Sequence, residues 1–325
     1  MISSPSVSVI IPTYNRATVL PRALDSVIAQ TMDDWEIVLV DDGSTDRTAA
    51  LAARYKTKLG DRLRYLRQSN GGSSDARNAG IDACRGQLVA FLDSDDEFLP
   101  HKLARQLELL ELRPELGLVY SDYEYVDIDG RHHSSVFDAL APNARLVPRT
   151  TVAPGLCVCT DLFDSLIRGY FIATIVGMVR REVLGSDIRF PSGLCYAEEW
   201  LFYLKIARIC PAGYVSEPLC VHHHTAGSLA RTNKRLNAVR YRDVLRAIDD
   251  AFSDLTGAQR KALHGNLSGA CRQLGYDAYL SGRHFDAFGH FAESLGYRLT
   301  ARSLSGLLQS LPHALLSGRR GILSA

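Results

Sequence analysis

Three acidic side chains, Asp93, Asp95 and Asp96, come directly after the short apolar run 88–92, which reads as a buried strand. Two carboxylates two residues apart at a strand end can reach one hard cation and a diphosphate bound to it. Because the ligand atoms are all oxygen, the expected cation is Mn²⁺ or Mg²⁺. Aspartate is also common in turns and helix starts, so a turn explains the triplet better when it is taken alone.

Three further polar clusters carry side chains suited to holding a nucleotide. Tyr14, in the stretch Pro-Thr-Tyr-Asn-Arg, has a ring that can stack on a nucleobase. Asp42, in Asp-Asp-Gly-Ser, can accept a hydrogen bond from a base imide or a ribose hydroxyl. Arg77 follows a glycine pair that permits close backbone approach, and its guanidinium can pair with phosphate. Each cluster alone is equally compatible with a loop or a capped helix.

The elements that must position these clusters alternate between strand and helix. Such alternation predicts a parallel, doubly wound sheet, and ligands of such sheets bind beyond the carboxyl ends of the strands. The polar clusters all follow strands, so we expect them at one edge. The predicted strands are 7–11, 35–40, 63–66 and 88–92, and the predicted helices between them are 17–30, 45–59 and 74–84.

The pattern is less regular in the second half of this region. Residues 129–165 contain three prolines and are expected to form a long functional or mobile loop. A strand is expected over 171–180, a helix over 197–210 and extended chain over 214–221. From about residue 233 the apolar spacing becomes helical throughout. We therefore expect one domain over 1–230 and a small all-helical region over 231–325.

The order and spacing of the four clusters resemble glycosyltransferase family 2, whose domain has the GT-A fold. The matching stretches are 7–16, 41–46, 76–80 and 91–96. The resemblance is strong over residues 7–120, weaker to about 230 and absent beyond. It implies an α/β fold with a Rossmann-like, mostly parallel sheet. Four motifs in register are very hard to obtain by accident.

The resemblance also implies roles for individual residues. Tyr14 would stack on the base, usually uracil in this family, Asp42 would contact the base, and Asp93 would lie near the ribose. Asp95 would bind a metal that bridges the diphosphate, and His224, in a run of three histidines, would lie close to that metal. The nucleotide-binding residues implied are Pro12, Tyr14, Asn15, Asp42, Arg77 and Asp93.

A pair of acidic residues, Glu198 and Glu199, opens the helix expected over 197–210. Family members usually have Glu-Asp here, with the aspartate acting as general base, so the base position falls on Glu199 and Glu198 is the alternative. The pair also suits an acidic first helical turn. Trp200, beside it, is either an acceptor platform or part of the core.

The resemblance predicts an inverting transfer by a single displacement. The donor would be a nucleoside-diphosphate sugar, UDP-linked in the first instance. The acceptor would be a saccharide or lipid-linked hydroxyl, in cell-surface polysaccharide or glycolipid assembly. A non-catalytic nucleotide- or carbohydrate-binding protein on the same fold is the alternative. A nicotinamide dehydrogenase would need the GxGxxG motif, which this sequence lacks.

The composition excludes several other classes. Lysine plus arginine number 37 and aspartate plus glutamate 36, so an even charge balance gives no case for nucleic-acid binding. Seven cysteines without a CxxC pair argue against a disulfide framework or a zinc ribbon. No secretory signal and no membrane-spanning run is seen, which predicts a cytoplasmic enzyme, peripheral at most on the inner membrane face.

The C-terminal region carries a second charge pattern. No aspartate or glutamate follows Glu293, whereas Arg298, Arg302, Arg319 and Arg320 lie among leucines at helical spacing. This pattern is typical of a helix that lies on a membrane surface. It is equally compatible with a terminal helix packed on its own domain.

Overall fold

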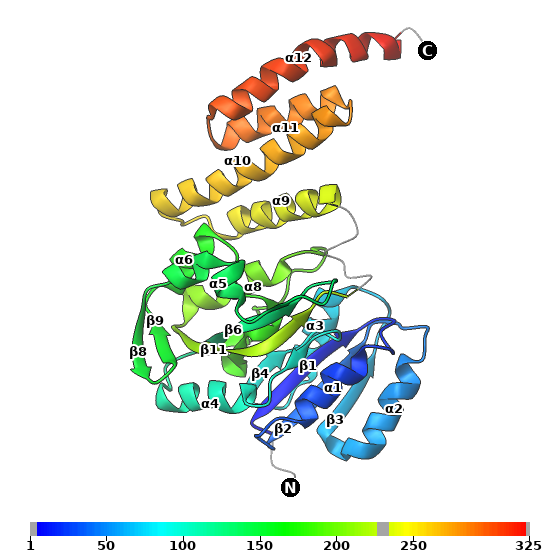
Figure 1. The fold of residues 1–325 in the computed structure, drawn as a ribbon, viewed down its shortest axis with the longest axis vertical. Helices are drawn as coiled ribbons and strands as arrows, with labels where there is room; N and C mark the ends of the chain where they lie inside the picture. The colour runs from blue at the N-terminus through cyan, green and yellow to red at the C-terminus, as the bar shows by residue number, and fades with distance from the viewer. Residues whose placement is uncertain (1–4, 226–233, 323–325) are drawn as a thin grey trace. The chain divides into compact units, whose positions relative to one another are not determined.

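The computed structural model describes residues 5–225 and 234–322. The chain divides into two compact units, Met1–Ala226 (unit 1) and Gly227–Ala325 (unit 2). Unit 1 is built on a sheet of eleven strands in its described residues (Figure 1). The strands are β1 (Val7–Thr13), β2 (Trp35–Asp41), β3 (Leu63–Arg67), β4 (Leu88–Phe91), β5 (Glu97–Phe98), β6 (Leu118–Val126), β7 (His132–His133), β8 (Arg149–Ala153), β9 (Leu156–Cys159), β10 (Met178–Arg180) and β11 (Ala212–His223).

The sheet has the order β3-β2-β1-β4-β10-β6-β11-β9-β8, with β5 on β11 and β7 on β6. Its first four strands are parallel, and β10 runs antiparallel to both of its neighbours. Every residue of β1 and β2 is buried, as expected for parallel strands covered on both faces. The order in which strands are added to the sheet reverses at β1. The strands β2 and β3 are added on one side of β1, and β4 is added on its other side. Crevices at such reversals are where ligands bind in open α/β sheets.

Eight α-helices flank this sheet in the described part of unit 1, and the alternation predicted for its first half is present (Figure 1). Helix α1 buries Leu20, Leu24 and Val27, the face indicated by the apolar spacing. The helices are α1 (Leu20–Ile28), α2 (Thr48–Leu59), α3 (Ser73–Ala83), α4 (Lys102–Leu112), α5 (Val136–Ala139), α6 (Leu162–Arg168), α7 (Arg181–Leu184) and α8 (Glu198–Ile209).

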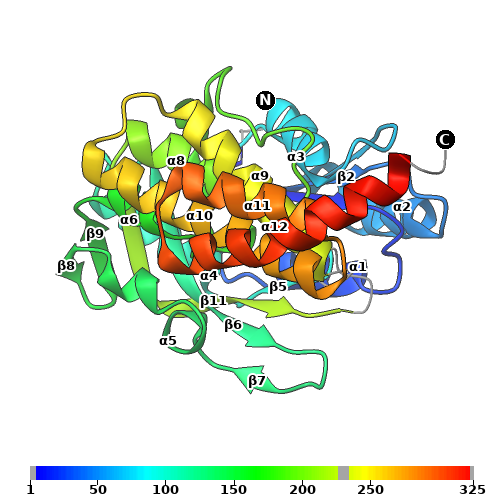
Figure 2. The same ribbon diagram turned by 90° about the horizontal axis from the view of Figure 1, so that it is seen from above.

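Two expectations for the second half of unit 1 are wrong. Residues 129–165 are no structureless loop, because they contain β7, α5, the hairpin β8–β9 and the start of α6 (Figure 2). Gly155, with φ of 75°, makes the turn of that hairpin, and β9 pairs antiparallel with β11. Residues 171–180 form a 3₁₀ turn followed by the three-residue β10, not one long strand. Apolar composition alone does not separate these two structures in a buried segment.

Gly80 shows why the third motif needs a glycine inside a helix. A Cβ atom at this position of α3 would overlap Cγ2 of Ile10 on β1, a β-branched side chain with little freedom to move. Gly80→Ala is therefore expected to lower the free energy of unfolding by about 1–3 kcal/mol, measured by urea denaturation. Gly289→Ala is the control, because a Cβ there meets nothing within 4 Å. It should stabilise by about 0.5–1 kcal/mol. Equal effects of the two changes would contradict this account of Gly80.

Unit 2 is all-helical in its described residues, as predicted. Its helices are α9 (Lys234–Ala251), α10 (Gly257–Leu280), α11 (His284–Tyr297) and α12 (Ala301–Ile322). Thr256 and Gln259 form a capping box that starts α10. Phe291 packs with Ala278 and Ala287 in a small core between α10 and α11. Across the described parts of both units, we find no helix with the length and apolarity that crossing a bilayer requires.

Candidate active site at the carboxyl ends of the central strands

The first two motifs are joined to each other after β1 and β2. Asn15 adopts a left-handed backbone conformation, with φ of 52°. Its Oδ1 accepts from the backbone N–H of Thr45 (2.8 Å), and its own N–H donates to Oγ of Ser44 (2.9 Å). The adjacent Tyr14 keeps 47% of its surface exposed, as suits a ring offered to a ligand. Pro12, by contrast, is a buried member of β1.

Asp42 is buried at the end of β2 and ties down the loop that leads into α3. Its carboxylate accepts from the backbone N–H groups of Gly71 (2.9 Å) and Gly72 (2.8 Å). It also accepts from the side-chain amide of Gln68 (2.8 Å). Backbone N–H groups held this way have a fixed position. The residue expected to contact the base thus also shapes the loop beside it.

Arg77 bridges two carboxylates from distant parts of the chain. Its guanidinium donates to Asp93 Oδ1 (2.6 Å) and to Glu198 Oε1 (2.7 Å), and its side chain is only 5% exposed. Burial opposes the charge on Arg77, but the carboxylates of Asp93 and Glu198 outweigh burial and raise the pKa of Arg77. The bridge therefore joins the third motif, the acidic triplet and the start of α8. Both of these hydrogen bonds of Arg77 are made to carboxylates.

The three aspartates after β4 have different surroundings. Asp96 is fully buried, and its carboxylate accepts from the backbone N–H of His223 (2.8 Å) and lies 3.0 Å from Nδ1 of His222. Asp95 is partly exposed and accepts from Oγ1 of Thr225 (2.7 Å). Asp96 thus anchors the end of β11 to the triplet, whereas Asp93 and Asp95 are partly exposed after β4.

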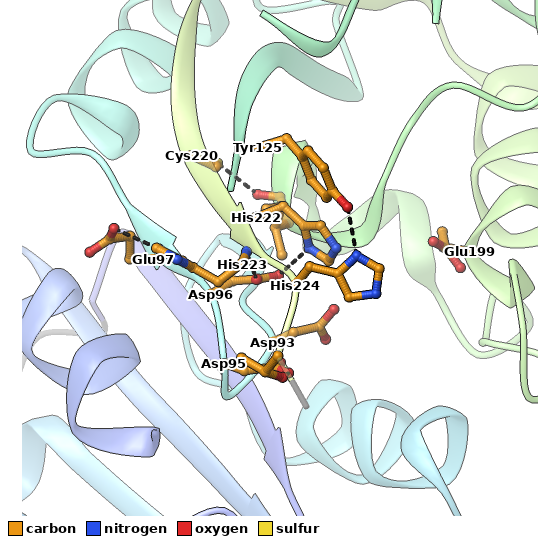
Figure 3. Close-up of polar contacts among 12 residues, drawn as sticks. Asp93, Asp95, Asp96, Glu97, Tyr125, Glu199, Cys220, His222, His223 and His224 are labelled. Atoms are coloured by element: carbon orange, nitrogen blue, oxygen red, sulfur yellow. Dashed lines mark hydrogen bonds and ion pairs between the residues drawn. The ribbon is translucent and has the colours of Figure 1, made fainter. Parts of the chain in front are cut away.

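The three consecutive histidines each contact a different group (Figure 3). His222 lies against Asp96, and His223 Nε2 lies 2.8 Å from Glu97 Oε1. His224 Nδ1 lies 2.6 Å from the hydroxyl of Tyr125. Burial lowers the pKa of His222, but Asp96 more than offsets it and the pKa is raised to about 9. Of the three, His224 is the one held by a neutral side chain in these contacts, which suits a metal ligand.

The two acidic residues at the start of α8 have different hydrogen-bond partners. Glu198 is buried and accepts from Arg77 and from Oγ of Ser73 (3.0 Å). Glu199 instead accepts from the hydroxyl of Tyr170 (2.6 Å). Burial, and then the neighbouring Glu198 carboxylate, raise the pKa of Glu199 to about 7. Glu199 therefore has the acidity of a general base that works near neutral pH.

The backbone before Glu199 is held in a conformation that costs energy. Ala197, which precedes α8, has φ of 52°, a left-handed conformation that is costly for a residue with a Cβ. In the described chain only Asn15 and Ala197 are non-glycine residues with positive φ. Both lie beside the candidate site, where such conformations are often concentrated. Trp200 is a core residue, since it is 1% exposed and its Nε1 donates to the carbonyl of Leu166 (2.8 Å).

The side-chain ligand atoms at this site fit a metal ion that is also bound by the substrate. In the ranges that the structure describes, no three His, Cys, Asp or Glu side chains are grouped so as to hold a metal by themselves. Mg²⁺ sites commonly use one or two carboxylates and complete the shell with substrate phosphates. Asp95 offers such a carboxylate. The contact between Tyr125 and His224 Nδ1 is the kind that orients a ligating imidazole.

Tyr170 and Tyr125 are site residues that the sequence does not predict. Tyr170 lies 29 residues before Glu199, and Tyr125 lies 99 residues before His224. Neither belongs to one of the motifs, and both are brought in by tertiary packing. No local signal in the sequence identifies them.

A known protein family matches the N-terminal half of this chain. The model described as "Glycosyl transferase family 2" matches residues 8–157 of this chain. That range includes β1 through β6, the acidic triplet, and all of the polar clusters except the start of α8 and the histidines. It ends within β9.

Some relatives match most of this chain, and others match only about a third of it. The succinoglycan biosynthesis protein ExoO of Rhizobium meliloti (strain 1021) is 32% identical over 271 residues, which cover 82% of this chain and 74% of that protein. An uncharacterized glycosyltransferase of Nostoc sp. is 44% identical over 114 residues, which cover 35% of each chain. One from Rickettsia prowazekii is 41% identical over 127 residues, covering 39% of each. The chain thus spans little more than a third of the length of the latter two.

Solved structures resemble the whole described chain. TarS 1-349 of S. aureus in complex with UDP-GlcNAc aligns with a TM-score of 0.69 at 19% identity, covering 97% of this chain and 92% of that one. The mannosyltransferase PcManGT from Pyrobaculum calidifontis, in complex with GDP-Man and Mn²⁺, aligns with a TM-score of 0.57 at 19% identity. That alignment covers 97% of this chain and 87% of the other. At this identity the likeness establishes a common fold.

Proposed function

This chain belongs to glycosyl transferase family 2 and has the expected GT-A fold; within that family, we propose that it is an inverting enzyme with Glu199 as its general base. One observation carries the proposal. Of the two carboxylates at the start of α8, Glu198 is paired with Arg77, whereas Glu199 is held by a tyrosine and has a pKa near 7. Glu199 can then take the proton of an acceptor hydroxyl as its oxygen attacks the sugar.

The donor we propose is a nucleoside-diphosphate sugar, a UDP-sugar first. Tyr14 would stack on the base, Asp93 would lie near the ribose, and Pro12 and Asn15 would line the same pocket. Asp42 would reach the base from the loop that it also anchors, and Arg77 would help hold the nucleotide through Asp93. Support comes from the structural neighbours, whose complexes contain UDP-GlcNAc and GDP-Man. Thermal denaturation in the presence of a panel of nucleotide sugars tests this, since a bound donor raises the melting temperature of the protein.

We propose that Asp95 and His224 hold a Mn²⁺ or Mg²⁺ ion together with the donor diphosphate. When bound, that ion neutralises charge on the departing nucleotide diphosphate. Metal dependence finds support in the Mn²⁺ that accompanies GDP-Man in PcManGT. Asp95, at the end of the β4 loop, supplies the oxygen ligand and Thr225 orients its carboxylate.

Metal and nucleotide binding should strengthen each other, because neither has a complete site without the other. We expect calorimetry to show weak Mn²⁺ binding alone, and UDP binding about 5- to 150-fold tighter with Mn²⁺ than without. Asp95→Ala should remove that coupling, while Glu111→Ala, a change at an exposed position of α4, should keep it. UDP binding that ignores Mn²⁺ in the parent protein would contradict the proposed metal site.

The acceptor we propose is a saccharide or lipid-linked hydroxyl in cell-surface polysaccharide or glycolipid assembly. The name of the Rhizobium relative supports this, since it is a succinoglycan biosynthesis protein. The place of action would be the cytoplasmic side of the membrane, where nucleotide sugars are made. Turnover separates this proposal from a non-catalytic binding protein: the latter would bind the donor without releasing nucleoside diphosphate.

A further inference from the structure

The side chains of helix α12 are divided unusually between its buried and its exposed side. The residues that face its own unit are small, namely Ser303, Gly306 and Ser310, and all three are buried. A Cβ at Gly306 would overlap the ring of Phe291 on α11, so the two helices pack closely. The fully buried residues of α12 are therefore small or polar, and Leu307 beside them packs against the Phe291 core.

Polar contacts also hold this buried side. Ser303 Oγ lies 2.8 Å from Ser294 Oγ and accepts from Oγ1 of Thr300 (2.7 Å). Ser294 in turn donates to the carbonyl of Ser268 on α10 (2.8 Å). With its inner side held by these serines, a glycine and Leu307, α12 does not need its outer leucines for folding. Its position in unit 2 is thus independent of the opposite face.

The leucines of α12 lie on the solvent side. Leu304, Leu308 and Leu311 keep 45%, 59% and 39% of their surface exposed. Their spacing of four and three residues puts them in one stripe along the helix. The loop residue Leu299, just before α12, is 83% exposed. In the sequence, the same spacing continues to Leu315. A stripe of three exposed leucines on the outer side of a helix calls for an apolar partner.

The charge of the segment indicates which partner. From residue 294 to the last residue the sequence has four arginines and no acidic residue. Arg298, just before α12, and Arg302, in its first turn, are exposed. A helix with leucines on one side and only cationic charge in its own segment fits the surface of an anionic membrane. An interface between two copies would bring these arginines together without any acidic partner in the segment.

We propose that the leucine face of α12 (Leu304, Leu308 and Leu311), in a segment whose only charged side chains are arginines, lies on an anionic lipid surface. The leucines would enter the boundary between headgroups and acyl chains, and the positive charge of the segment would be attracted to the anionic surface. This goes beyond the proposed catalytic function and uses none of its residues. For an enzyme with a lipid-linked acceptor, it would hold the chain where that acceptor is found.

Vesicle sedimentation with the full chain tests the proposal. We expect the protein to pellet with phosphatidylcholine vesicles that contain phosphatidylglycerol, less with phosphatidylcholine alone, and less again at high salt. The triple change Leu304→Ser, Leu308→Ser, Leu311→Ser should lower the partition coefficient by at least about tenfold. The matched control, Leu112→Ser, Leu140→Ser and Leu146→Ser, removes three exposed leucines from unit 1 and should bind like the parent.

A second variant keeps the test decisive if the leucine changes disturb folding. Arg298→Glu with Arg302→Glu should weaken binding to the anionic vesicles and leave binding to the neutral ones unchanged. Parent-like binding of the triple-serine variant would overturn the proposal. So would a parent that ignores anionic vesicles, or a dimer in sedimentation velocity that only the triple change abolishes. Donor hydrolysis in solution should be unaffected by the triple change, so this proposal and the catalytic one fail separately.

Discussion

Replacing Glu199 with glutamine is expected to lower the rate of sugar transfer by about 10²- to 10⁴-fold. The change keeps the shape of the side chain and its contact with Tyr170, but it removes the group that takes the acceptor proton. Binding of the nucleotide sugar should change little, because Glu199 makes none of the contacts proposed for the donor. Steady-state rates and donor titration with the two proteins measure both effects. A glutamine variant with the parent's rate would remove Glu199 from the mechanism.

The pH dependence gives a second reading of the same residue. A general base works only when ionised, so the parent's rate should rise with pH through about 7, where Glu199 loses its proton. Tyr170→Phe removes a hydrogen bond that lowers the pKa of Glu199, while Glu198 and Arg77 stay in place. The rise should therefore move to higher pH in that variant. A rise that stays at the parent's pH would show that another group controls it.

Replacing Arg77 with methionine is expected to lower the free energy of unfolding by about 3–5 kcal/mol. Methionine fills much of the space but leaves the Glu198 carboxylate buried without its cation, and Asp93 loses the same partner. Because the bridge joins α3, the β4 loop and α8, its loss should also displace Glu199. We expect the variant to lose transfer activity even at temperatures where it remains folded. Chemical denaturation and rate measurements on one preparation give both values.

Lysine at position 77 is the matched control for this prediction. A single ammonium keeps the charge but lacks the planar fork that reaches Asp93 and Glu198 at once. Arg77→Lys should therefore recover part of the stability and little of the activity. A methionine variant of full stability whose only defect is weak nucleotide binding would contradict the bridge. It would favour direct phosphate contact by Arg77.

The first half of unit 1 could be predicted almost completely from the sequence. Its strands are continuous apolar runs because both faces of a parallel sheet are buried. Each run is followed by a polar cluster at the edge where ligands bind, and the structure does place Asn15, Asp42, Asp93 and Asp95 at that edge. Here local pattern and tertiary structure agree, so the motif positions and the fold could be predicted together.

The partners of the site residues could not be predicted in the same way. The neighbours of Arg77 in sequence, glycines and small polar residues, suggest a phosphate partner and give no sign of its protein partners. The carboxylates that hold it come from Asp93 and from Glu198, which is 121 residues away. Likewise, the choice between Glu198 and Glu199 depends on which of them meets Arg77 and which meets Tyr170. Sequence spacing carries no information on such contacts.

Segments with mixed composition were the other difficulty. The prolines of residues 129–165 suggested a loop, yet short strands there add to the sheet through β9 and β11. In α12 the leucine spacing correctly predicted a helix, but it would ordinarily place the leucines inside. Only the packing of Ser303, Gly306 and Ser310 on the inner side shows that the stripe faces outward. Helical periodicity identifies the apolar face of a helix, but it does not show whether that face is buried or exposed.

The central claim, a single displacement assisted by Glu199, is tested most directly by the configuration of the released sugar. The protein would be incubated with Mn²⁺ and a UDP-sugar whose anomeric linkage is α, and the first product would be followed by proton NMR before it mutarotates. The account predicts that the β anomer appears first and that the Glu199→Gln variant forms it far more slowly. Release of the α anomer first, at the same rate from both proteins, would contradict it.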